Sequence, residues 1–232
     1  MDTFTEQTQA VSMADPLGTM VATRWTWQDS TQAIIARTHG HLLALATAGN
    51  KLRDEAGAQR TARRLTDKGL REHLVDFLSR EFAPAYRRAD HDGRRGIERQ
   101  IETLRAQGVR KIEPTDAAAA MLRSDLRRMF FDMTVGRRKA LLIEPPALLA
   151  TALLELPEAF HGMEADEADR LRERAFGAEF PEQAGQIEEL RAVHEFVVSG
   201  LTVARDDAMR SAEISLADFN EVVWHGEPAS AI

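Results

Sequence analysis

The sequence predicts an all-α protein, a multi-helix bundle with two long helices and an extended N-terminal arm. In two stretches, about 31–56 and 182–213, small and apolar side chains recur at alternating steps of three and four residues. Such steps place side chains along one side of a helix. Only 6% of the residues are aromatic, so we expect a core made mainly of Leu, Ala, Ile, Val and Met.

Residues 1–28 form the expected arm. Val21, Thr23, Trp25 and Trp27 share one parity, so in an extended conformation they lie on one side of the chain. Trp25 and Trp27 either pack on the protein's own core or dock on a neighbouring subunit, because tryptophan is common in both environments.

Residues 29–232 are expected to form a single helical domain, with a sub-boundary near 108–115 as the alternative. The first long helix has its seam at Ile35, Thr38, Leu42, Leu45, Gly49 and Leu52. A second apolar face follows and is expected to end at Pro84, since proline disrupts helix interiors. The charge-dense stretch 86–96 is predicted as a loop.

A further helix is expected after Thr115, a residue suited to an N-cap. Its predicted core face consists of Leu122, Leu126, Met129, Phe130 and Met133. Ser215 is the predicted N-cap of a short final helix.

The seam of the second long helix is Ile187, Leu190, His194, Val197 and Leu201, continued by Ala204, Ala208 and Ser211. This heptad-like pattern is typical of helices that pack against one another over a long distance. His194 in such a seam favours a hydrogen-bonded, register-setting role over a metal-ligand role. Whether the two long seams pair within one chain or between two chains stays open at this point.

Charge is distributed unevenly along the chain. Residues 51–140 hold 22 Lys and Arg against 14 Asp and Glu, whereas residues 141–232 hold 6 Arg against 19 Asp and Glu. The cations singled out as an interface for a polyanion or a subunit are Arg53, Arg60, Arg64, Lys68, Arg71, Arg87, Arg88, Arg94 and Arg95. This polarity indicates either an anionic partner or complementary faces that meet within or between copies.

The sequence points away from enzymatic chemistry and from a cofactor or metal. It contains no cysteine, which excludes disulfides and thiol nucleophiles. It also lacks the phosphate-loop, dinucleotide-binding, zinc-protease and nucleophile-elbow motifs. The residues Asp90-His91-Asp92-Gly93 match only the middle of a calcium-binding loop. When they are aligned with such a loop, its first and last positions, which need carboxylates, hold arginines in this sequence. No secretory signal or membrane-spanning stretch is apparent, so we expect a cytoplasmic protein or one inside a virion-like particle.

The favoured function is therefore a non-enzymatic structural or assembly protein. We expect it to self-associate, or to join other subunits, through its basic part (51–140) and its acidic part (141–232), as in a phage-type particle. The alternative is a nucleic-acid-binding or regulatory helical protein that uses the arginine-rich stripe and loop.

Overall fold

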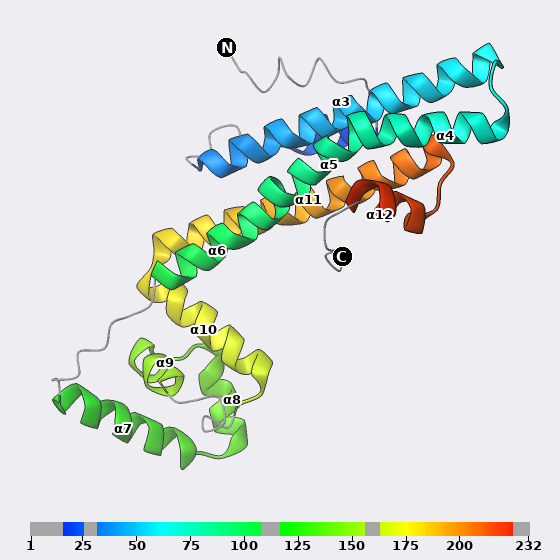
Figure 1. Ribbon diagram of the computed structural model, residues 1–232. Helices are drawn as coiled ribbons and strands as arrows, with labels where there is room; N and C mark the ends of the chain where they lie inside the picture. The colour runs from blue at the N-terminus through cyan, green and yellow to red at the C-terminus, as the bar shows by residue number, and fades with distance from the viewer. Residues whose placement is uncertain (1–15, 26–31, 108–116, 156–162, 225–232) are drawn as a thin grey trace. The chain divides into compact units, whose positions relative to one another are not determined.

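The structure is a computed structural model and describes residues 16–25, 32–107, 117–155 and 163–224 (Figure 1). Every regular element within these ranges is helical, which confirms the predicted all-α, multi-helix architecture. The elements in chain order are α2 (Pro16–Arg24), α3 (Ala33–Ala62), α4 (Asp67–Phe77), η1 (Leu78–Phe82), α5 (Ala83–Arg88), η2 (Ala89–Arg94), α6 (Arg95–Gln107), α7 (Ala117–Phe131), α8 (Val135–Ile143), α9 (Ala147–Leu154), α10 (Ala165–Glu179), α11 (Pro181–Ala212) and α12 (Leu216–Trp224). The segments η1 and η2 are π-helical turns.

The chain divides into two compact units. Unit 1 comprises residues 1–101 and 190–232, and unit 2 comprises residues 102–189. The boundaries fall inside α6 and α11, so each of these helices contributes residues to both units. The predicted sub-boundary near 108–115 lies outside the described residues.

The two longest helices occupy the stretches in which the sequence predicted them. Helix α3 has 30 residues and α11 has 32. In unit 1 both seams are buried: Ile35, Thr38, Leu42, Leu45 and Leu52 on α3, and Leu190, Val197, Leu201, Ala204 and Ala208 on α11. A Cβ at Gly200 would lie 3.2 Å from Leu17 Cδ1 and 3.4 Å from Leu42 Cδ2. The absence of a side chain there lets α11 pack closely against α2 and α3.

The stretch 86–96, predicted as a loop, is helical instead. Helices α4, α5 and α6 follow one another without a break, joined by η1 and η2. The high density of charge does not prevent a helix here, because two nearby arginines pair with the buried carboxylate of Asp90. Arg94 Nε donates to Asp90 Oδ1 at 2.6 Å, and Arg95 Nε donates to Asp90 Oδ2 at 3.1 Å.

Pro84 does not end the preceding helix as predicted. It is the second residue of α5, the helix that directly follows η1. A proline in a helix interior lacks an N–H donor and clashes with the carbonyl four residues before it. The i→i+5 hydrogen bonding of a π turn breaks the regular i→i+4 pattern at this point, so the helical run can continue through the proline.

Residues 16–24, expected in an extended arm, form helix α2. Leu17, Met20 and Val21 are buried, and their spacing of three and four residues is that of one helix face. The alternating pattern had suggested an extended conformation. The free energy gained by burying this apolar face favours the helix instead.

Trp25 follows α2 and packs on the chain's own unit 1. Its side chain is buried, and its ring centroid lies 4.7 Å from that of His39 on α3 and 5.4 Å from that of Phe196 on α11. Of the two readings that the sequence left open for Trp25, the structure therefore supports packing on its own core. Trp27 lies outside the described residues.

Unit 2 has a smaller core. Its buried cluster consists of Phe130, Leu149, Ala150, Leu153 and Leu171. Phe130 of α7 points into this core. Arg127 links α7 to the C-terminal end of α9: its Nη1 donates to Ala152 O at 3.0 Å and to Glu155 Oε2 at 2.9 Å. Arg123 Nε lies 2.6 Å from the other oxygen of Glu155.

The predicted core face of α7 is only partly core. Phe130 is buried, whereas Leu122 and Met129 each keep 48% of their surface exposed. The face toward α9 is centred on Phe130 and Arg127, so Leu122 and Met129 lie on the flank of the helix that α9 does not cover. Leu126 packs against the same core cluster as Phe130, so the predicted core face is correct for these two residues and wrong for Leu122 and Met129.

Two helix starts show the capping that their sequences favour. The Ser215 hydroxyl accepts a hydrogen bond from Asp218 N at 3.2 Å, which confirms Ser215 as the N-cap. At the start of α10, Glu164 and Glu167 form a reciprocal capping box.

Candidate interaction surface

Two of the predicted interface cations on α3 are used inside unit 1. Arg53 Nη2 donates to Asp207 Oδ2 at 2.5 Å. Arg60 Nη2 donates to Ser211 O and to Glu213 Oε1, both at 2.8 Å. These contacts join α3 to the C-terminal part of α11, so the seams of the two long helices meet within one chain in unit 1.

Two more of the predicted cations, Arg94 and Arg95, bind the buried Asp90 as described above. Arg94 also lies 3.6 Å from Glu98 Oε1, and that oxygen is 2.9 Å from Nε2 of His194. The histidine of the α11 seam thus contacts a carboxylate on α6 within unit 1. Burial of the nearby Tyr86 raises the pKa of its hydroxyl to about 12, so this residue stays neutral at ordinary pH.

The other five predicted cations are Arg64, Lys68, Arg71, Arg87 and Arg88. Arg64 is exposed in the turn between α3 and α4, and Lys68 and Arg71 are exposed on α4, where Lys68 Nζ lies 3.7 Å from Glu72. Arg88 is exposed on α5 and Arg87 is partly buried there. The nine cations therefore do not form one uniform surface, and four of them have strong partners within unit 1.

Histidines and carboxylates do not converge on a metal site in the described ranges. His39 is buried against Trp25, and burial lowers its pKa to about 4, so it is neutral and part of the core. His41 and His91 both lie near Asp92, at 3.9 Å and 3.1 Å. The hydrogen bond from His91 is the main reason why the pKa of Asp92 is lowered.

The largest departure from ordinary burial lies in unit 2. Of the ten large apolar side chains that are exposed among the described residues, seven belong to this unit. We call these seven the exposed apolar residues of unit 2: Met121, Leu122, Met129, Phe131, Val135, Ile143 and Leu148. Single exposed apolar residues are common, but seven in a unit of this size offer apolar area to a partner.

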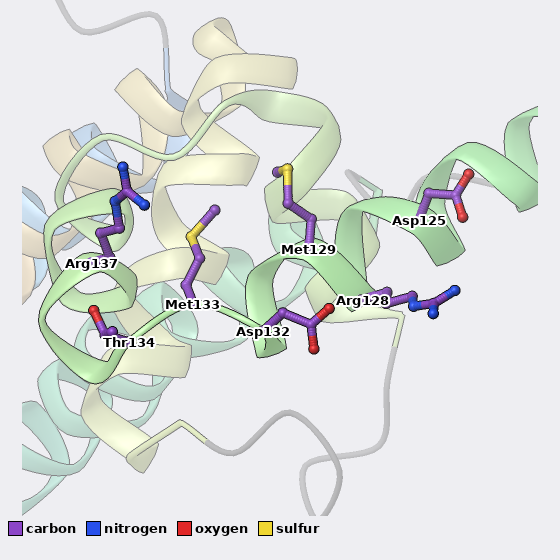
Figure 2. Close-up of a pocket in the computed structure, with 7 residues that line it drawn as sticks. All are labelled: Asp125, Arg128, Met129, Asp132, Met133, Thr134 and Arg137. Atoms are coloured by element: carbon purple, nitrogen blue, oxygen red, sulfur yellow. The ribbon is translucent and has the colours of Figure 1, made fainter.

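A shallow hollow of about 530 Å³ lies where α7 meets α8. It is lined by Asp125, Arg128, Met129, Asp132, Met133, Thr134 and Arg137. Figure 2 shows Met129 and Met133 pointing to the same side, with Arg137 of α8 beside Met133. Unbranched methionine side chains adapt their shape to a partner and are frequent on protein-binding surfaces.

Sequence reasoning missed this surface because it treated Leu122 and Met129 as core. The composition of the sequence gave a weaker indication of this surface. Residues 117–149 contain several Met, Leu and Ile side chains, but few helices in this part of the chain are long enough to cover them. The seam residues Leu190, Val197 and Leu201 are buried in unit 1, and Ile187 is buried in unit 2. They support the fold and are not available to a partner.

Comparisons with protein-family models, with curated proteins and with solved structures found no match. Within the described ranges, none of the helices combines the length and the apolar character needed to cross a membrane.

Proposed function

We propose that this chain is a non-enzymatic assembly protein that joins copies of itself, or other subunits, into a larger particle. The observation that carries this proposal is the number of large apolar side chains that unit 2 exposes. Covering several half-exposed Leu, Ile and Met side chains would stabilise a contact with a partner by roughly 25 cal/mol per Å² of apolar surface.

The charges support the same proposal in a modified form. Basic and acidic parts of the sequence do meet, but the pairs found lie within units: Arg53 with Asp207 in unit 1, and Arg127 with Glu155 in unit 2. Charges already paired contribute little to a further contact. We therefore propose that apolar side chains form the main contact between subunits and that the exposed charges increase the rate at which the subunits associate.

Self-association is assigned to the exposed residues around the turn between α8 and α9. Ile143 at the end of α8 is 64% exposed and Leu148 at the start of α9 is 53% exposed. The two prolines between them, Pro145 and Pro146, lack backbone donors and restrict the local conformations of the turn. A restricted turn holds its apolar side chains ready for a partner with little further ordering cost.

The test is light scattering behind a size-exclusion column, at low and at high salt. We expect a discrete oligomer under both conditions, because an apolar contact is not weakened by screening. Leu148→Glu is expected to lower the measured mass toward that of the monomer. The matched control is Leu216→Glu, since Leu216 is similarly exposed but lies on α12 in unit 1; it should leave the mass unchanged.

Other outcomes discriminate between the candidate functions. An oligomer that dissociates only at high salt would favour the complementary-charge contact, and a monomer at both salts would contradict self-association. Binding of nucleic acid is the second candidate, supported by the exposed Arg64, Lys68 and Arg71. A complex with added duplex DNA that dissociates steeply with salt would favour it.

A further inference from the structure

In unit 1, cations gather where the N-terminal half of α3 packs against the π turn η2. The contact is close: a Cβ at Gly93 would lie 3.5 Å from Thr38 Cγ2, and a Cβ at Gly96 would lie 3.7 Å from Ile34 Cδ1. The charged side chains at this junction come from α3, α5, η2 and α6. We call them the basic patch: Arg37, His41, Arg88, His91, Asp92 and Arg99.

The carboxylate of Asp92 joins the parts of the basic patch. His41 Nε2 on α3 lies 3.9 Å from Asp92 Oδ2, and His91 Nδ1 lies 3.1 Å from Asp92 Oδ1. Arg99 Nη2 on α6 donates to the backbone oxygen of His91 at 3.4 Å. Two histidines thus contact the carboxylate, and this reduces its repulsion of an incoming anion.

Arg37 and Arg88 reach the same junction from α3 and α5. Burial lowers the pKa of His41; Asp92 opposes this shift, and Arg37 and Arg88 add to it. Both guanidinium groups therefore lie near one imidazole ring. Both arginines are exposed, and no ion pair joins either of them to a carboxylate in the part of the chain that the structure describes.

Positive charge is in excess at the basic patch. The nearest other carboxylate in sequence, Asp90, is buried and is held by Arg94 and Arg95. Residues 33–53 of α3 contain no Asp or Glu, and α5 contains none either. Three arginines therefore share a surface with one carboxylate, Asp92, and an anionic partner is attracted to such a surface.

The cations around the turn between α3 and α4 have no such excess. Arg64, Lys68 and Arg71 are exposed there, but Asp67 and Glu72 are exposed among them. Lys68 Nζ lies 3.7 Å from Glu72 Oε1. This second group holds as many Lys and Arg residues as the basic patch but twice as many carboxylates, so it is a suitable comparison.

The chemistry of the basic patch favours phosphate groups over a protein partner. Protein interfaces depend on aromatic and other large anchors that become buried. The large apolar side chains that the described part of unit 1 exposes lie elsewhere, in the α3–α4 turn and on α11 and α12: Leu65, Val198 and Leu216. Arginine forks bind phosphate oxygens in pairs, and interfaces with nucleic acids are more polar and more positive than protein interfaces.

We propose that the basic patch binds the phosphate backbone of a nucleic acid, with Arg37, Arg88 and Arg99 each contacting a phosphate. Because the three arginines are exposed on three different helices, they suit a chain of phosphates better than a single ion. This inference rests on the second candidate function and gives it a site other than the α3–α4 turn. Phosphate contacts carry no sequence information, so we expect binding without base specificity.

The experiment measures the binding of fluorescent duplex DNA of mixed sequence to the full-length chain by fluorescence anisotropy. Three phosphate contacts predict that the logarithm of the binding constant falls with the logarithm of the salt concentration, with a slope of about −2.7. Arg37→Gln with Arg88→Gln should weaken binding about tenfold at about 0.15 M salt and bring the slope closer to zero by about two. Circular dichroism should show unchanged helix content, because both positions are exposed.

The matched control is Arg64→Gln with Arg71→Gln, which removes the same charge from exposed positions of unit 1 outside the basic patch. Nearly the full length of α3 separates Arg37 from Arg64, on the order of 40 Å at about 1.5 Å per residue. This separation far exceeds the Debye length of about 8 Å at physiological salt. The control should therefore keep the affinity and the slope of the unchanged chain.

Equal losses in the two variants would overturn the inference, because net charge alone would then explain binding. A loss in the control alone would move the site to the α3–α4 turn and would also overturn it, while leaving nucleic-acid binding in place. Poly-glutamate that competes as well as unlabelled DNA would show a carboxylate partner instead.

No DNA binding by the unchanged chain would contradict both the inference and the second candidate function, whereas light scattering decides the assembly function separately. DNA binding by the Leu148→Glu variant that is lost when Arg37→Gln and Arg88→Gln are added would support the inference independently of self-association.

Discussion

The seam of α11 and the apolar residues of α7 follow the same three-and-four spacing, but they differ in how fully they are buried. On α11, Leu190, Val197 and Leu201 are buried in unit 1. On α7, Leu122 and Met129 remain half exposed in unit 2. The difference lies in the neighbours: α11 packs against α2, α3 and α6 in unit 1, whereas the main neighbour of α7 in unit 2 is α9. The spacing shows that one face of a helix is apolar. It does not show which other element, if any, buries that face.

The largest effect that would test this comparison is expected from Phe82 in unit 1. Phe82 is fully buried; its ring stacks on that of Tyr86 at a centroid distance of 5.9 Å and meets that of Phe219 edge to face at 6.3 Å. Phe82→Ala should lower the free energy of unfolding by about 3–5 kcal/mol, through lost burial and the cavity it leaves. Urea unfolding followed by circular dichroism measures this loss.

The control for that measurement is Phe131→Ala in unit 2. Phe131 is partly exposed at the end of α7, and its removal should cost about 1 kcal/mol or less. If the two substitutions cost the same, the proposed contrast between the two units is wrong.

A smaller effect is expected from pH, again in unit 1. The pKa of His39 is lowered from 6.5 to about 4 by burial, so the unfolded chain binds a proton that the folded chain does not. Stability should therefore fall as the pH drops from about 6.5 to about 4, by up to about 3 kcal/mol from this residue. His39→Gln should lack this component, which the difference between the two pH–stability curves would isolate. Parallel curves would contradict a neutral, buried His39.

The smallest effect is expected at Leu122 on α7. Leu122→Gln should change the free energy of unfolding by about 0.5 kcal/mol or less, because the side chain is half exposed. A matched Leu153→Gln in the core of unit 2, where the side chain is fully buried, should cost several times more. A large loss of stability from Leu122→Gln would show that this side chain is buried and would contradict its half-exposed position.

The sequence predicted the long helices well because each seam repeats over many turns. Local rules failed where a distant or unusual partner decides the structure. The stretch 86–96 reads as a loop until one knows that both oxygens of Asp90 are taken by Arg94 and Arg95, four and five residues later. Alternation at Val21 and Trp25 suggested an extended arm, but contact with α3 and α11 favours a helix there.

The candidate site was predictable only in part. The nine cations were visible in the sequence, but Arg53 and Arg60 find their partners about 150 residues away, at Asp207 and Glu213. No local pattern predicts such pairs. Conversely, Met129 looks like a core residue in sequence, and only the position of α9 shows that it is not.

The π-helical turn η2 gives this chain an unusual response to changes in length. A turn closed by i→i+5 hydrogen bonds holds one residue more than an α-helical turn. The extra residue is taken up within the turn, so deleting one residue from η2 would restore a regular α-helical turn and leave the helices on either side in phase. Ile97 would keep its buried position and Glu98 its contact with His194, whereas the same deletion inside the regular helix α6 would rotate everything after it by about 100°. The irregular turn is therefore the part of this helical run that tolerates a change in length.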